Sequence, residues 1–184
     1  MTLDNCTLTS TSTTSSAIEN GWYYPSQNTE GTNCVLVIEG GTYTCGYYAV
    51  KNDDYGILTI NGGTFISTAG TSAAVLLNWN VATINDGTFE AQASNCYAIY
   101  NGSATSGSDA YTTYEAGDLT INGGTYIYET TYAITGTNRA EYATINGGTF
   151  SGNNLVRYSD RGAVSDGYSL VENSDGTYTV TASE

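Results

Sequence analysis

One seven-residue motif recurs along the chain and constrains its fold more than any other feature. In its clearest form it reads Thr59-Ile60-Asn61-Gly62-Gly63-Thr64-Phe65. The first residues, Thr2 to Leu8, form a worn copy of it. Self-similarity at a short period is typical of repeat architectures. The remaining copies begin at Val37, Thr83, Thr120 and Thr144.

Each copy combines two strand signals with one turn signal. Thr-Ile favours a strand because both residues are β-branched and their side chains face opposite ways. Asn-Gly favours a turn because both residues tolerate positive φ. The Thr-aromatic pair then resumes a strand. Since the unit recurs without a partner strand between copies, a hairpin is disfavoured. The motif instead predicts a bend between two strands of one coil, with successive coils stacked in parallel.

A second series, of apolar pairs between the motif copies, supplies a third strand for each coil. The motif isoleucines Ile38, Ile60 and Ile84 lie 22 to 24 residues apart. The sequence therefore predicts an all-β fold, a right-handed parallel β-helix (solenoid) of about six coils over residues 1–164. Residues 165–184 are expected to add a C-terminal β-hairpin around Asp175-Gly176. The apolar pairs are Ala17-Ile18, Ala49-Val50, Ala74-Val75, Ala98-Ile99, Ala133-Ile134 and Leu155-Val156.

The alternation of strand side chains predicts which residues face the interior. The motif isoleucines should point inward, and the motif aromatics should stack along the axis. The motif threonines should form an outward row, and the motif asparagines should form an amide ladder at the bend. The predicted inward aromatics are Tyr43, Phe65, Phe89, Tyr126 and Phe150. The predicted third wall is Val50, Val75, Ile99, Ile134 and Val156. The predicted ladder is Asn61, Asn85, Asn122 and Asn146.

Charge and composition disfavour several classes of protein. The net charge of −14 argues against nucleic-acid partners and anionic membrane surfaces. No apolar stretch is long enough for membrane insertion. The absence of histidine removes serine triads, Cys-His dyads and histidine metal sites. The four cysteines lack C-x-x-C spacing, which disfavours a zinc site and leaves buried thiols or disulfides open. These features fit a soluble, secreted or surface-exposed protein.

The T-I-N-G-G-T-[FY] copies resemble the repeats of right-handed β-helix surface proteins of the pectate-lyase-like superfamily. Such repeats occur in large secreted proteins of gut Firmicutes and in virion proteins of their phages. The segment Asp166 to Val180 also resembles one that often follows these repeats. The resemblance covers nearly the whole chain, and it implies the fold and an extracellular, cell-surface or virion-surface location. It carries almost no information about activity.

Two insertions, in the first and fourth coils, leave the predicted stack at the same corner. In a solenoid, insertions at one corner lie on one face, which is often the binding face. Aromatic rings stack on the apolar faces of sugars, and polar side chains bind their hydroxyls. The leading hypothesis is therefore a non-catalytic module that binds a glycan or a surface protein at this corner, although the rings could instead pack the insertions onto the stack. The candidate ligand-binding residues are Trp22, Tyr23, Tyr24, Tyr55, Trp79, Tyr111 and Tyr114.

Two other functions remain open, a polysaccharide-degrading β-helix enzyme and a structural spacer or fibre subunit. A glycosidase needs a carboxylate pair, and several carboxylates, including Asp53 and Asp54, fall near the insertion corner. Asp53 and Asp54 could also hold calcium, although neither an EF-hand nor a calcium-binding repeat is present. No other cofactor is expected. The first coil should expose strand edges, so we expect a covering domain or stacking into a homo-oligomer there.

Overall fold

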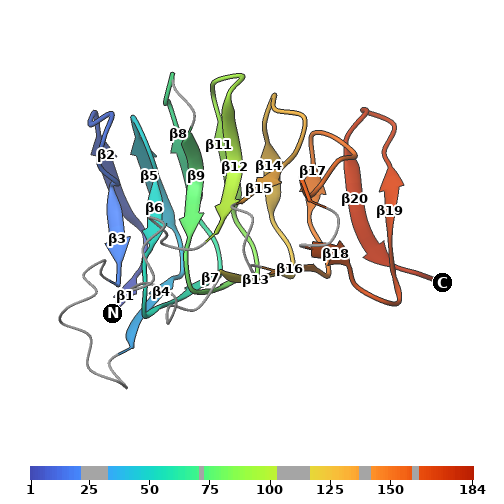
Figure 1. Ribbon diagram of the computed structural model, residues 1–184, viewed down its shortest axis with the longest axis horizontal. Coiled ribbons are helices and arrows are strands. Elements are labelled where there is room, and N and C mark those ends of the chain that lie inside the picture. Colours follow the sequence, from blue (N-terminus) through green and yellow to red (C-terminus); the bar gives the residue numbers. More distant parts are fainter. Residues whose placement is uncertain (22–32, 71–72, 103–116, 137–141, 159–161) are drawn as a thin grey trace, which may run out of the picture.

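The computed structural model describes residues 1–21, 33–70, 73–102, 117–136, 142–158 and 162–184. In these ranges the regular secondary structure is entirely β-strand, and no helix occurs. The strands form three sheets, which we name A, B and C (Figure 1). All neighbours in sheets A and C pair in parallel. The prediction of an all-β chain with parallel strands is therefore confirmed.

Sheet A collects the Thr-Ile half of every motif copy. Its register aligns equal positions, so that Ile84 pairs with both Ile60 and Ile121. The worn first copy also keeps this register, because Leu3 pairs with Ile38. One further strand, which the sequence did not predict, places Val164 beside Ile145. The sheet order is β1 (Thr2–Leu3), β4 (Cys34–Ile38), β7 (Gly56–Ile60), β10 (Val81–Ile84), β13 (Asp118–Ile121), β16 (Tyr142–Ile145) and β18 (Gly162–Val164).

Sheet B collects the Thr-aromatic half of every copy. Its motif strands pair in parallel, with Phe89 in register with Phe65 and Tyr126. The last two strands form an antiparallel hairpin, and the hairpin joins the sheet antiparallel to β17. The predicted hairpin around Asp175-Gly176 is therefore present. The sheet order is β2 (Cys6–Ser10), β5 (Gly41–Cys45), β8 (Thr64–Ser67), β11 (Thr88–Ala91), β14 (Thr125–Ile127), β17 (Thr149–Phe150), β20 (Tyr178–Ala182) and β19 (Tyr168–Glu172).

Sheet C contains the apolar pairs, and one of its predicted registers is wrong. Val50 and Ile99 both pair with Leu76, whereas Val75 was expected at that position. The reason is that all six residues of β9 are buried, so polar alternation cannot fix its register. Val75 is also fully buried. The sheet order is β3 (Ile18–Asn20), β6 (Val50–Asn52), β9 (Ala73–Asn78), β12 (Cys96–Asn101) and β15 (Ile134–Thr135).

The bend between sheets A and B depends on the second glycine of each motif copy. This glycine has positive φ in the five clear copies, between 96° and 131°. At Gly124 an added Cβ would lie 2.9 Å from the carbonyl oxygen of Gly87 in the preceding copy. The bend predicted from Asn-Gly is present, and its positive φ falls on the second glycine of each copy. These glycines are Gly41, Gly63, Gly87, Gly124 and Gly148.

The predicted amide ladder runs along this bend. Asn85 donates to Asn61 over 2.7 Å, and Asn122 donates to Asn85 over 2.8 Å. Asn146 continues the row by donating to Asn122 over 2.9 Å. Glu39 begins the row by accepting a hydrogen bond from Asn61. The ladder is exposed along most of its length, so it aligns the repeats without a large cost of burying polar groups.

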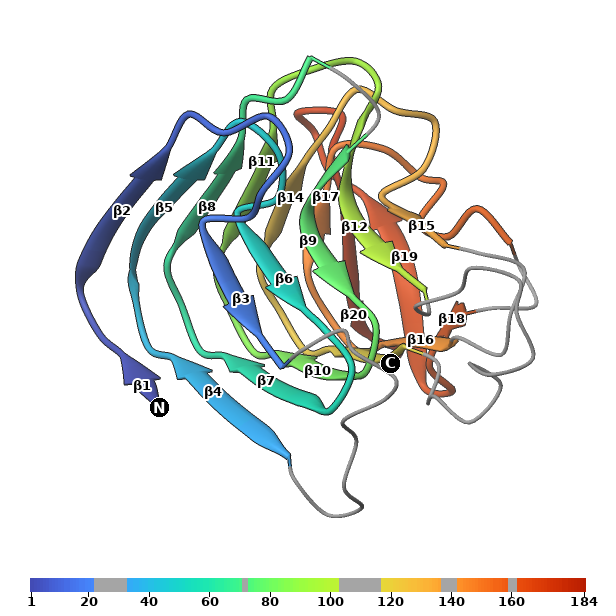
Figure 2. The ribbon, with the colours of Figure 1, turned by 60° about the vertical axis from the view of Figure 1, so that its left-hand side comes forward.

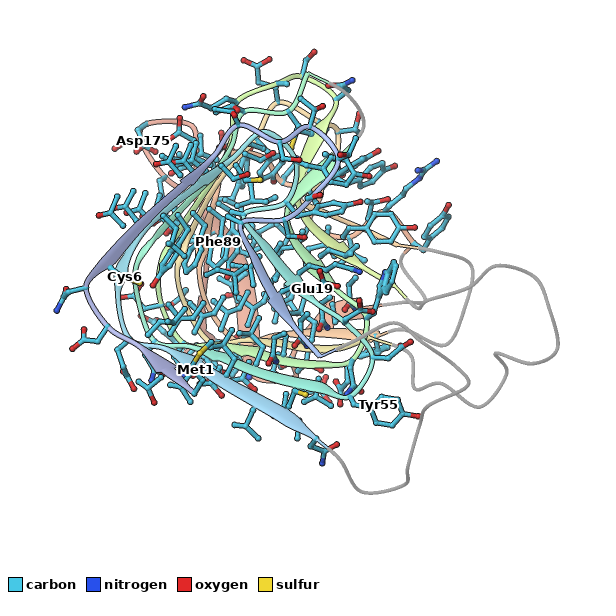
Figure 3. All side chains as sticks on the ribbon, turned by 90° about the vertical axis from the view of Figure 1, so that its left-hand side faces the viewer. Met1, Cys6, Glu19, Tyr55, Phe89 and Asp175 are labelled. Carbon is cyan, nitrogen blue, oxygen red and sulfur yellow. The ribbon has the colours of Figure 1, made fainter. Side chains whose placement is uncertain are left out.

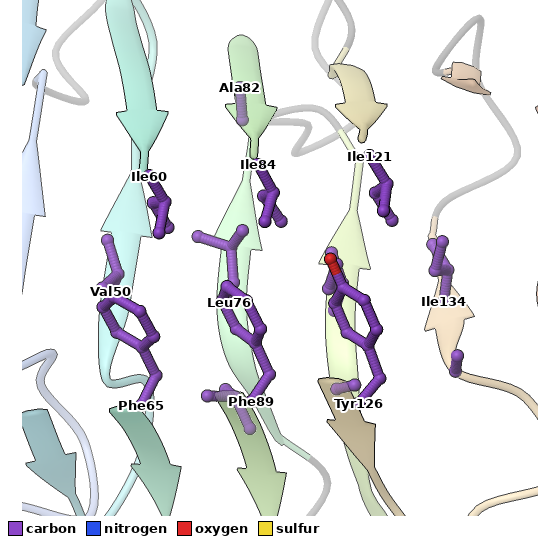
Figure 4. Close-up of a cluster of buried hydrophobic side chains, with 14 of the residues drawn as sticks. Val50, Ile60, Phe65, Leu76, Ala82, Ile84, Phe89, Ile121, Tyr126 and Ile134 are labelled. Carbon is purple, nitrogen blue, oxygen red and sulfur yellow. The ribbon is translucent and has the colours of Figure 1, made fainter. Parts of the chain in front are cut away.

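The three sheets surround one hydrophobic core, as Figures 2 and 4 show. The motif isoleucines and aromatics are fully buried, which confirms the inward prediction for these two rows, whereas Val156 of the third wall is only partly buried. The aromatic rings stack in series from Tyr43 to Phe150, with centroids 4.6 to 5.1 Å apart and interplanar angles of 8° to 14°. Each ring fills the space beneath its neighbour, so every inner ring of the row packs against two others.

At the N-terminal end, β1, β2 and β3 are each the last strand of their sheet among the described residues. Leu8, on β2, is 39% exposed. An unpaired strand edge can accept a further strand. The expectation of a covering domain or of stacking into a homo-oligomer at this end stays a prediction.

Truncating one ring in the middle of the aromatic row tests the core. Phe89→Ala should lower the free energy of unfolding by about 3–5 kcal/mol, because it leaves a cavity between two stacked neighbours. Ile127→Ala is the control, since Ile127 is 42% exposed on the adjacent strand β14 and should cost within about 0.5 kcal/mol. Denaturant unfolding measures both values. Equal losses in the two variants would contradict the assignment of Phe89 to the core.

Candidate functional site

An open depression of about 340 Å³ lies on the outer side of sheet C. Glu19, Lys51 and Leu77 form its base, and they stand in register on β3, β6 and β9. These positions alternate with the inward residues of the same strands, and Figure 3 shows Glu19 on the outside while Phe89 lies in the interior. We name it the Trp79 depression, and its remaining lining residues are Thr14, Ser15, Ser16, Tyr47, Tyr48 and Trp79.

Lys51, the single lysine of the chain, organises this depression. Its ammonium lies 2.5 Å from Asp53 and 3.0 Å from Glu19. It also lies over the Trp79 ring, 4.8 Å from the ring centroid. Burial alone would lower the pKa of Lys51, but the two carboxylates outweigh burial and raise it. The ammonium is therefore charged, and it fixes the position of the Trp79 ring.

Two consecutive tyrosines, Tyr47 and Tyr48, also line the depression. The rings of Tyr47 and Tyr48 lie 4.0 Å apart between centroids, and the Tyr48 hydroxyl donates to the Tyr47 hydroxyl over 3.1 Å. Burial, followed by this hydrogen bond, raises the pKa of Tyr48. Ser67 donates to the Tyr47 carbonyl over 2.6 Å and so fixes the backbone at this point. The depression thus offers aromatic rings, hydroxyls and charged groups held by a sheet.

Asp53 and Asp54 lie beneath this surface. Asp53 is fully buried and paired with Lys51, while Asp54 is 3% exposed. The Oδ1 atom of Asp54 has no hydrogen-bond partner among the described residues. In those residues no group of three or more acidic or cysteine side chains is placed to hold a metal ion. The calcium site at Asp53 and Asp54 stays a prediction that requires further ligands.

A second asparagine ladder, which the sequence analysis missed, supports the edge of sheet C from inside. Asn20 donates to Asn52, Asn52 to Asn78 and Asn78 to Asn101, each over 2.8 Å. All four are at most 7% exposed. Each amide also donates to backbone carbonyls at the turn into sheet A. The available signal was an asparagine two residues after the inward apolar residue of four successive repeats.

The two ladders provide a matched test of buried and exposed amides. Asn78→Ala should cost about 1–3 kcal/mol of unfolding free energy, because it deprives buried neighbours of their partners. Asn122→Ala, in the exposed ladder, should cost less than about 1 kcal/mol, because water replaces the lost bonds. Chemical denaturation of both variants measures the difference. Similar costs would show that burial does not distinguish the ladders.

Asp54 should make stability depend on pH. Burial, and next the charge of Asp53, raises the pKa of Asp54 from 3.8 to about 7. The folded protein then keeps Asp54 protonated where the unfolded chain ionises it. The stability from this group is complete below about pH 4 and is lost as the pH rises to about 7.

Unfolding free energies at pH 5 and pH 8 test this effect. The wild type should lose more stability between these values than Asp54→Asn, which cannot ionise at this position. Identical pH dependence in the two proteins would contradict the raised pKa.

The structure brings together only part of the predicted aromatic corner. Trp79 lines the depression, but Tyr55 is not among the described residues that line it. Tyr55 lies in a turn with φ of 62°, and Figure 3 shows it apart from Glu19. The sequence analysis missed Tyr47, Tyr48 and Lys51, although an isolated lysine after an apolar pair was a usable signal. The other predicted ligand-binding residues lie outside the described ranges; they are Trp22, Tyr23, Tyr24, Tyr111 and Tyr114.

Comparisons with protein-family models, with curated proteins and with solved structures found no match. The described residues contain no helix that is long and apolar enough to span a membrane. All four cysteines are free thiols; Cys45 and Cys96 are buried, and Cys34 is exposed. Any functional conclusion therefore depends on the geometry of the Trp79 depression and on the sequence motifs.

Proposed function

We propose that the chain is a right-handed parallel β-helix module that binds glycans without catalysis, outside the cell or on a virion. Three strands per repeat, each in register with its counterpart in the next repeat, support the β-helix. The resemblance of the motif to pectate-lyase-like surface proteins supports the location, as does the net charge of −14. A structural spacer would share these features, so the evidence for binding comes from the outer face of sheet C.

The Trp79 depression is the observation that carries this proposal. Its volume of about 340 Å³ lies within the range of ligand sites. Its lining combines the Trp79 ring with the hydroxyl residues Ser15 and Ser16, and Lys51 and Glu19 add charged groups. A ring next to hydroxyl and charged groups suits a pyranose, which has apolar faces and a polar edge. The Trp79 ring is held by the ammonium above it, so little ordering is needed on binding.

The carboxylates favour binding over catalysis. A glycosidase needs two carboxyl groups that reach the scissile bond. Asp53 is fully buried against Lys51, and Asp54 lies beneath the surface, so neither reaches a ligand in the depression. Glu19 is the remaining acid in the lining, and it is paired with Lys51. A single paired carboxylate suits hydrogen bonding to a sugar hydroxyl.

Trp79→Ala is the direct test of this function. Screening the wild type on a glycan array identifies a ligand, and isothermal titration then gives its affinity for each variant. Trp79→Ala should weaken binding about tenfold or more, because the stacking ring is lost. Tyr142→Ala, which removes an exposed tyrosine from sheet A, should leave affinity unchanged.

Thermal melts of both variants should remain close to that of the wild type. Unchanged binding by Trp79→Ala, or no glycan ligand on the array, would contradict the proposal. Binding of a protein in the absence of glycan would favour the protein-partner alternative.

A further inference from the structure

A second depression, of about 430 Å³, is also lined by residues of sheet C and of the turns that lead into it. Tyr97, on β12, and Tyr132, just before β15, supply aromatic rings that are partly exposed. Thr130, Thr131 and Ser94 supply hydroxyls, and Thr130 donates to the Tyr132 carbonyl over 2.7 Å. This Tyr132 depression repeats the combination of rings and hydroxyls that is found around Trp79.

Neighbouring strands of sheet C connect the two depressions. Leu77 on β9 lines the first depression beside its partner Lys51, and Ala74 of the same strand pairs with Tyr97 of the second depression. Two strand spacings across the sheet separate β6, which carries Lys51, from β12, which carries Tyr97, or roughly 10 Å. A ligand that crosses the strands could therefore contact both depressions without leaving the face.

The charges of the two depressions indicate which ligand fits. Around Trp79, one ammonium faces the carboxylates of Glu19 and Asp53, so the local charge is negative. The Tyr132 depression holds one acid, Glu129, and one base, Arg157. The whole chain carries a net charge of −14. An acidic polymer would be repelled, because the described residues around Trp79 include no unpaired cation to offset the negative charge, whereas a neutral polymer would not be repelled.

We propose that the two depressions form one extended site for a neutral, linear oligosaccharide that lies across the strands of sheet C. This inference depends on the proposed function, because it assigns the ligand class and the length of the same binding face. Binding two connected subsites with one chain makes the second contact intramolecular. Affinity should therefore rise steeply with chain length until both depressions are filled.

Isothermal titration with a neutral disaccharide, tetrasaccharide and hexasaccharide of the sugar selected on the array tests the inference. Wild-type affinity should rise at least tenfold from the disaccharide to the hexasaccharide. Tyr132→Ala should weaken hexasaccharide binding about tenfold and leave disaccharide binding unchanged, because the short ligand occupies the Trp79 depression alone. Tyr142→Ala should match the wild type throughout. If Tyr132→Ala melts early, Tyr97→Ala takes its place.

The outcomes separate this inference from the proposed function. Hexasaccharide binding that falls in Trp79→Ala but not in Tyr132→Ala or Tyr97→Ala would overturn the extended site and leave the function intact. Binding that survives Trp79→Ala would overturn both. The hexasaccharide with its primary alcohols oxidised to carboxylates should bind at least tenfold more weakly than the neutral form. Equal affinity of the two forms would overturn the assignment of a neutral ligand.

Discussion

Backbone hydrogen bonding between equal positions of successive motif copies is the interaction on which the structure depends. Because the register never slips in sheet A, each side chain lies beside its own counterpart in the next copy. Stacked aromatic rings and amide ladders follow from that register, and they strengthen it in turn. The second glycine of the motif makes the arrangement possible, since a Cβ there would press on the copy before it.

The repeated and the varied positions have different roles. On sheet A the outward row repeats threonine at Thr59, Thr83, Thr120 and Thr144, which gives a uniform surface. On sheet C the outward row changes at every strand, from Glu19 through Lys51 and Leu77 to Tyr100. Inside, the same strands keep apolar residues and asparagines. A uniform interior thus supports a varied outer face, as expected where recognition is built on a stable scaffold.

Much of the fold could be predicted because the motif itself contains the strand and turn signals of each repeat. Thr-Ile, the glycine bend and the aromatic predict two strands of each repeat, their inward residues and the exposed asparagine ladder. The predicted strand register was wrong in Ala73–Asn78. All of its residues are buried, so no alternation of buried and exposed positions marks which side chains face inward. There the buried asparagine ladder gives the register instead, because Asn78 pairs with both Asn52 and Asn101.

The site was less predictable than the fold, for a physical reason. A depression forms where loops and strands from several repeats meet, so its lining is set by tertiary packing. Trp79 was identified from residue type, whereas Tyr47 and Tyr48 reach the site only because the chain turns into β6 beside them. Lys51 and its two carboxylate partners are brought together by strand pairing between β3 and β6 and by the turn after β6.

A nuclear magnetic resonance titration of the labelled chain with the neutral hexasaccharide tests the central claim most directly, because it reports every backbone amide at once. The account predicts that shift changes concentrate on the sheet C face, around Lys51, Trp79, Tyr97 and Tyr132, while the threonine row of sheet A stays unchanged. Shift changes centred on sheet A or sheet B, or none at saturating ligand, would contradict it.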